Sequence, residues 1–128
     1  MTDAPLPAPL PAAGPPRPKF GGLAVRTRRD DDAVIVSLTG DIDLATAPEL
    51  RKAAEEALRD RPRLLVLDLA DVEFLASAGL AVLLAIQAQA EGVVRVVAAS
   101  RATLRPIELT GLDRQLAMFD SVEAALAG

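Results

Sequence analysis

One serine in the sequence is placed where a hydroxyl group could accept a phosphoryl group. Ser77 stands among very small side chains in the run FLASAGL, residues 74–80. A buried strand is expected before it and an apolar helix after it. The first N–H groups of a helix have no partner within the helix, so a phosphate can be accommodated there. The position predicts a regulatory switch at Ser77, with a purely structural role as helix cap as the alternative.

The composition leaves this serine without the groups that usually activate a nucleophile. The chain has no histidine and no cysteine, which excludes Ser-His-Asp catalysis, a cysteine nucleophile, a disulfide framework and a thiolate metal site. A nucleophile elbow also needs a glycine two residues before the serine, where this chain has Leu75. We therefore expect no enzyme, no cofactor and no metal, and hydrolysis by Ser77 is the disfavoured alternative.

Charge and hydropathy narrow the class of partner. The net charge is −4 and no run is rich in lysine or arginine, which argues against nucleic acid or an anionic membrane as a direct partner. Three phenylalanines, with no tryptophan or tyrosine, make a weak platform for stacking bases. No segment has the roughly 18 apolar residues of a membrane span, and no secretory signal pattern opens the chain. We expect a cytoplasmic protein that binds another protein or a small ligand.

The N-terminal region differs sharply in composition from the rest. Residues 1–18 hold seven of the ten prolines, interleaved with alanine and leucine. Such a composition cannot form a helix or a paired strand. We expect residues 1–20 to be a disordered or polyproline-like tail, with a ligand for a proline-recognition domain as the alternative, and residues 21–128 to form one folded domain.

The folded part is expected to be a small α/β domain. Strands are predicted over residues 23–29, 34–39, 64–67, 93–98 and 118–119, with a turn at 30–32 and a loop at 68–76. Helices are predicted to begin at residue 46, at 77 or 78, at 102 with an interruption at Pro106, and at 121. The second of these helices is apolar on most sides, which indicates deep burial or an interface. A hairpin followed by alternating helices and strands indicates a mixed sheet with helices on one or both faces.

Two acidic residues precede the first predicted helix. Asp41 and Asp43 could form an acidic rim for partner recognition, because recognition residues are often found on loops. A role in a turn or on the surface is the alternative. The segment from Thr46 to Glu49 has the pattern of a capped helix start, with a threonine, a proline in the first turn and an acid three residues on.

Four motifs in order resemble one known family over residues 21–128. They are LTGDID at 38–43, VLDL at 66–69, VEFLASAGL at 72–80, and LTGLD at 109–113 followed by MFDSVE at 118–123. Together they resemble the STAS domain, in particular the bacterial anti-sigma-factor antagonists. The resemblance implies a mostly parallel sheet with one antiparallel edge, flanked by helices.

The resemblance also implies a function. An antagonist of this kind binds an anti-sigma factor that is a serine kinase with a GHKL-type ATP site, and so frees a sigma factor. The kinase phosphorylates one serine, which by motif position is Ser77, and a PP2C-type phosphatase removes the phosphate. The residues expected to contact the partner are Asp41, Asp43, Ala76, Ala78, Gly79 and Leu80.

The chain departs from the family pattern on both sides of the serine. The best-known members have an aspartate before it and a serine or threonine after it, where this chain has Ala76 and Ala78. Ser77 is therefore the single candidate acceptor in the motif. The departure also keeps an alternative function open, a STAS module without a phosphorylation switch, in a lipid-transport ABC system or a stress-signalling scaffold.

Overall fold

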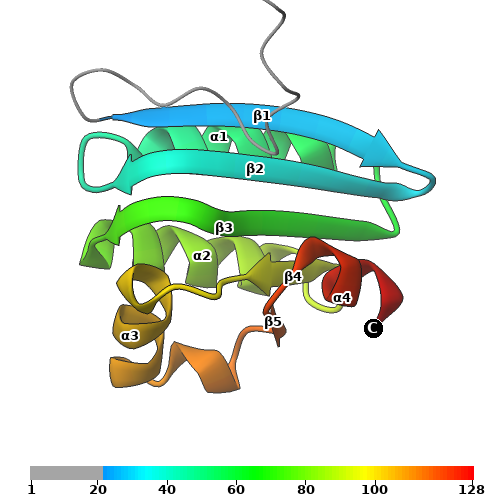
Figure 1. Ribbon diagram of the computed structural model, residues 1–128. Helices are drawn as coiled ribbons and strands as arrows, with labels where there is room; N and C mark the ends of the chain where they lie inside the picture. The colour runs from blue at the N-terminus through cyan, green and yellow to red at the C-terminus, as the bar shows by residue number, and fades with distance from the viewer. Residues whose placement is uncertain (1–21) are drawn as a thin grey trace, which may run out of the picture.

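Five strands form one sheet in the computed structural model, which describes residues 22–128 (Figure 1). They are β1 Leu23–Asp30, β2 Ala33–Ile42, β3 Leu64–Leu75, β4 Val94–Val97 and β5 Met118–Phe119, and they lie side by side in chain order. β1 runs antiparallel to β2, and every later neighbour is parallel. The predicted α/β fold, a mostly parallel sheet with an antiparallel edge, is confirmed. The predicted tail of residues 1–20 lies outside the described residues.

Helices cover both faces of the sheet (Figure 1). They are α1 Ala47–Leu58, α2 Ser77–Gln89, α3 Arg101–Leu109 and α4 Val122–Ala127, with a short 3-10 helix, η1 Leu112–Arg114, that the sequence did not predict. The first three contribute to one large core, whereas α4 covers the other face through Ala125, which packs with Ile35 and Val66. Among residues 22–128, no helix combines the length and apolar character needed to cross a membrane.

The predicted hairpin is confirmed at the antiparallel edge. Asp31 and Asp32 form a two-residue turn between β1 and β2, and Asp31 adopts a φ of +53°, in the left-handed region that aspartate tolerates better than most residues. β2 is buried along almost its whole length, whereas most of β1 is exposed. β1 is therefore an edge strand with water on its outer side.

β3 is longer than its sequence predicted. Residues 64–67 are buried, as expected for a central strand, but the strand continues to Leu75 and the predicted loop at 68–76 is wrong. Two register shifts against β2 occur in this second half. Because of these shifts, Asp71 and Glu73 are exposed while Val72 and Leu75 stay buried. The regular alternation of buried and exposed residues, by which a strand is recognised in a sequence, is thereby lost.

α3 is continuous through its proline. Pro106 was expected to interrupt the helix, and that prediction is wrong. A proline removes one backbone donor, but the bonding pattern resumes at once, because the Thr110 N–H donates to the Pro106 carbonyl at 3.2 Å. Ile107, next to the proline, is fully buried, and its packing holds the helix against the core.

Candidate functional site

Two segments far apart in the sequence meet where β2 and β3 end. Ile42 lies opposite Leu75 in the parallel register, and the Ala76 N–H donates to the Ile42 carbonyl at 2.8 Å. This bond fixes the loop after β2 beside the start of α2. The residues that the sequence singled out, 41–43 and 76–78, are thereby brought together at the carboxyl ends of β2 and β3.

Ser77 is exposed and its hydroxyl is not used by the fold. It is the first residue of α2, Ala76 occupies the N-cap position, and the Ser77 hydroxyl makes no hydrogen bond with any residue in 22–128. The capping alternative is therefore wrong. The Gly79 and Leu80 N–H groups donate to the Ala76 carbonyl at 2.9 and 3.1 Å, so the N–H groups of Ser77 and Ala78 precede the first helical bonds. Negative charge is favourable at such a helix start.

Gly79 lets the first turn of α2 lie close to the strand ends. A Cβ at this position would come within 2.5 Å of Ile42 Cγ2 and 2.7 Å of Leu75 Cδ1, far inside contact distance. Leu80, the next residue, is buried in the core. Both were predicted to contact a partner. Both residues are buried in this structure, where they pack against the core, and their contact with a partner stays a prediction.

The outer side of α2 is an exposed stripe without charge. Residues at helical spacing from Ser77 are all exposed, namely Ala81, Leu84 and Ala88. None of the thirteen residues of α2 is charged. The inner side is buried through Leu83 and Ile86, so the helix serves both the core and a free surface. Ser77 stands at the head of this surface, which we call the α2 stripe (Ser77, Ala81, Leu84 and Ala88).

Asp43 organises the loop that leads from β2 into α1. Its Oδ1 accepts from the Ala45 and Thr46 N–H groups, both at 3.0 Å, and lies 3.1 Å from Thr46 Oγ1. Thr46 Oγ1 in turn accepts from the Asp43 N–H at 2.9 Å and lies 2.7 Å from the Asp41 carbonyl oxygen. Thr46 is the N-cap residue, as predicted, but its hydroxyl points back into this network and caps no N–H of α1.

Loss of the Asp43 carboxylate is expected to destabilise the domain by about 1–2 kcal/mol, because two backbone donors lose a charged acceptor. Asp43→Ala should lower the urea midpoint of unfolding without changing the denaturant slope. Asp43→Asn keeps an oxygen acceptor and should lose less than half as much. Equal stability of Asp43→Ala and the wild type would show that the network contributes nothing.

Two exposed apolar side chains flank this region, and the sequence did not single them out. Phe74, opposite Asp41 in the register, is 53% exposed, and Leu44, which follows Asp43, is 82% exposed. The sequence did offer one sign of an exposed apolar side chain here, because Phe74 falls within the segment 68–76 that was predicted to be a loop. Residues 22–128 contain no group of three or more acidic, histidine or cysteine side chains that could hold a metal.

Comparison with known proteins places this arrangement in a family. The family model described as "Mlab, STAS domain" matches residues 25–120, which is more than half of the chain and includes both segments of the site. The chain belongs to the STAS domain family. This STAS domain is 39% identical over 108 residues to "Anti-sigma-F factor antagonist RsfB" of Mycobacterium tuberculosis, covering 83% of this chain and 88% of that protein.

Solved structures agree with the assignment. The STAS domain matches the crystal structure of an anti-sigma factor antagonist from Mycobacterium paratuberculosis with a TM-score of 0.78 and 38% identity, over 82% of this chain and 92% of that one. SpoIIAA from Bacillus in its phosphorylated form gives a TM-score of 0.60 at 16% identity, over 81% of this chain and 97% of that one, and so shares the fold. The family predicted from the four motifs is confirmed.

Proposed function

We propose that this chain is an anti-sigma-factor antagonist that binds its partner over the α2 stripe and is switched off by phosphorylation of Ser77. The observation that carries the proposal is the exposed, unbonded Ser77 hydroxyl at the head of an exposed helix surface without charge. The relatives named as anti-sigma factor antagonists support the general function.

The chemistry of the site is compatible with a phosphate in the free protein. Phosphorylation adds about −1.5 to −2 charges and three acceptor oxygens. At Ser77 these oxygens would lie beside N–H groups that precede the first helical bonds, where an exposed negative charge gains roughly 0.3–1 kcal/mol. The domain would therefore stay folded when it is modified, and the effect of the phosphate would fall on the partner.

A partner that covers the α2 stripe would meet the phosphate directly. The stripe offers alanine and leucine, so a complementary surface is apolar and would have to exclude water around Ser77. Removing a dianion from water without a compensating cation costs several kcal/mol. Phe74 and Leu44 offer further exposed apolar side chains near the ends of β3 and β2, where Asp41 supplies a charge.

The enzymes that add and remove the phosphate are part of the proposal. The small neighbours Ala76 and Ala78 leave room for an ATP γ-phosphate to approach the Ser77 hydroxyl. We infer that the anti-sigma factor itself carries a GHKL-type serine kinase domain and that a PP2C-type phosphatase resets the switch. The chain then acts as substrate and regulator without catalysis of its own.

Mass spectrometry of the protein isolated from its own cells tests the switch. We expect a fraction that carries one phosphoryl group, localised to Ser77 and removed by a PP2C phosphatase, and no such fraction in Ser77→Ala. Ala76 and Ala78 stand where the best-known members have an acid and a second hydroxyl, and this departure keeps open the second candidate, a STAS module without a switch in a lipid-transport ABC system or a stress-signalling scaffold. Absence of phosphate at Ser77 under every growth condition, together with co-isolation of a transporter, would replace the first proposal with the second.

A further inference from the structure

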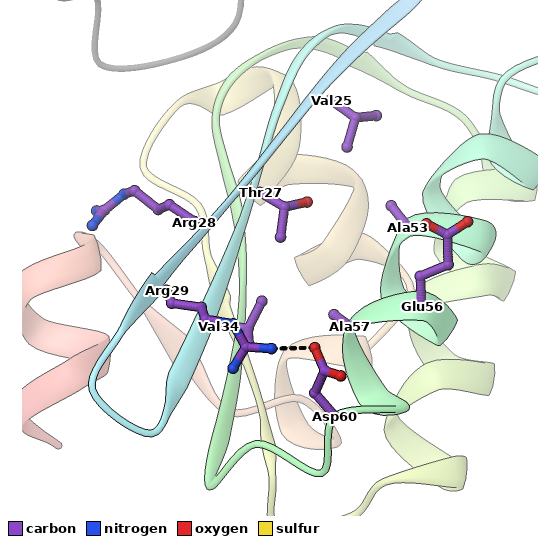
Figure 2. A pocket seen from close by; sticks show the side chains of 9 residues that line it. All are labelled: Val25, Thr27, Arg28, Arg29, Val34, Ala53, Glu56, Ala57 and Asp60. Atoms are coloured by element: carbon purple, nitrogen blue, oxygen red, sulfur yellow. Dashed lines mark hydrogen bonds and ion pairs between the residues drawn. The ribbon is translucent and has the colours of Figure 1, made fainter.

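A groove of about 390 Å³ runs along the free edge of the sheet, between β1 and α1 (Figure 2). Val25 and Thr27 of β1 project into it, and Ala53 and Ala57 of α1 form the opposite wall. The small alanine side chains leave the space between strand and helix open. Val34 of β2 contributes to the lining. None of the residues that line the groove belongs to the Ser77 site.

A second hollow lengthens this groove toward the start of α1. It shares Val25, Ala53 and Glu56 with the first and adds Glu49 and Lys52. At the other end, Arg29 and Asp60 form an ion pair across the groove (Figure 2). The combined groove therefore follows nearly the full length of α1. An elongated ligand would fit a groove of this shape.

The backbone beside the groove has unused hydrogen-bonding groups. β1 pairs with β2 alone among the described strands. The Asp41 N–H donates to the Gly22 carbonyl at 2.9 Å, which makes these two residues a hydrogen-bonded pair of the antiparallel register. Because such pairs alternate with non-bonded pairs, every second residue of β1 directs its N–H and C=O groups to the open edge. These residues are Leu23, Val25, Thr27 and Arg29.

The opposite face of β1 is basic. Arg26 and Arg28 alternate with Val25, Thr27 and Arg29 along β1, and Arg28, although it borders the groove, directs its side chain away from α1 (Figure 2). Arg28 is exposed and forms no ion pair within residues 22–128. An incoming strand would therefore face, on one side, a groove whose apolar lining comes from Val25, Val34, Ala53 and Ala57, and on the other side the Arg28 guanidinium.

We propose that this edge is a β-augmentation site for a partner segment in which acidic and apolar residues alternate. Such a segment extends the sheet by bonding to the outward backbone groups of β1. Its side chains opposite Val25 and Thr27 share their face and enter the groove, because directly opposite residues lie on the same side of a sheet. Its remaining side chains lie on the face of Arg28, whose exposed guanidinium can give a carboxylate charge-assisted hydrogen bonds.

A second copy of this chain fits the edge poorly. Antiparallel self-pairing of β1 centred on Thr27 would set Arg26 of each copy directly against Arg28 of the other. Like charges directly opposite one another destabilise a strand pair. The arginines therefore act against edge-to-edge self-association and select an acidic strand from another protein.

A short peptide tests the site without knowledge of the natural partner. The probe is a capped pentapeptide in which glutamate and valine alternate, with glutamate at both ends, titrated into the 15N-labelled full chain. We expect saturable amide shifts at Val25, Thr27, Arg29 and Ala53. The same peptide with lysine for glutamate should bind the wild type at least about tenfold more weakly, and Arg28→Glu should abolish this preference.

Two substitutions at Thr27 separate backbone pairing from side-chain contact. The Thr27 N–H points to the open edge, so Thr27→Pro removes one edge donor and keeps the bonds to β2. We expect about a tenfold loss of peptide affinity in Thr27→Pro and wild-type affinity in Thr27→Ala. Circular dichroism checks that each variant folds, and the Arg28→Glu exchange decides the question if Thr27→Pro does not. Shifts confined to α2, equal binding of both peptides, or no saturable shift would overturn the proposal.

Discussion

Ser77→Asp is expected to weaken binding of the anti-sigma factor by about 100-fold or more, whereas Ser77→Ala should bind as tightly as the wild type. The hydroxyl makes no hydrogen bond within residues 22–128, so its removal costs the free domain nothing. A carboxylate at the same position places a charge at the head of the α2 stripe. A partner that covers the stripe must then desolvate that charge.

Matched variants separate charge from shape. Ser77→Asn has nearly the volume of the aspartate variant but no charge, and we expect it to lose less than about tenfold in affinity. Gln89→Glu adds one negative charge to the same helix at its far end, roughly 18 Å away at the helical rise. It should bind as the wild type does. Isothermal titration with the purified anti-sigma factor measures all four variants on one scale.

The outcomes distinguish the switch from simple binding. Equal affinity of Ser77→Asp and the wild type would reject the phosphorylation switch and leave the STAS module of the second candidate. Equal losses in Ser77→Asp and Ser77→Asn would show that the interface excludes any larger side chain, so that steric fit and not charge controls it. Only a loss confined to the charged variant supports the proposed mechanism.

The regular part of the fold could be predicted because its residues follow simple periodicities. Residues 64–67 form a continuous apolar run, and the structure buries them at the centre of the sheet. α1 repeats apolar residues at helical spacing, and Leu50, Ala54 and Ala57 are buried as that spacing requires. In the first half of β3 a continuous apolar run, and in α1 one apolar face, determine which residues are buried. The local sequence pattern therefore agrees with the tertiary structure.

The second half of β3 could not be predicted, for a physical reason that also affects the site. Each register shift inserts an extra residue and reverses which side chains face the core. Phe74 is exposed as a result, although a phenylalanine is usually buried. The motif resemblance singled out Ser77, whereas the exposure of Phe74 and Leu44 is seen only when the elements are assembled.

The close packing of Gly79 against Ile42 and Leu75 predicts a large loss of stability when the glycine is replaced. Gly79→Ala is expected to destabilise the domain by about 1–3 kcal/mol, the usual cost of overpacking, even though alanine is the better helix former. The new Cβ would meet Ile42 Cγ2 at 2.5 Å and Leu75 Cδ1 at 2.7 Å. The leucine methyl group can swing aside. The isoleucine Cγ2 is attached to a stiff β-branched centre in a fully buried side chain, so the backbone must move.

A double-mutant cycle isolates this contact. Ile42→Ala removes the clashing methyl group and should itself cost about 2–5 kcal/mol, as large-to-small core substitutions do. In that background Gly79→Ala should become neutral or stabilising, and urea unfolding of the four proteins gives the coupling energy. Ala81→Gly, on the exposed side of α2, serves as the control for helix propensity alone. An equal cost of Gly79→Ala in both backgrounds would show that crowding against Ile42 is not the cause.

The same contact links stability to the site. The Ile42 carbonyl accepts from the Ala76 N–H, and the Ile42 side chain lies under Gly79, so one residue of β2 fixes both the cap and the first turn of α2. Any displacement that relieves the clash in Gly79→Ala must therefore move Ser77 relative to Asp41 and Asp43. We expect that variant to bind the anti-sigma factor more weakly even under conditions in which it is fully folded, although position 79 itself is buried.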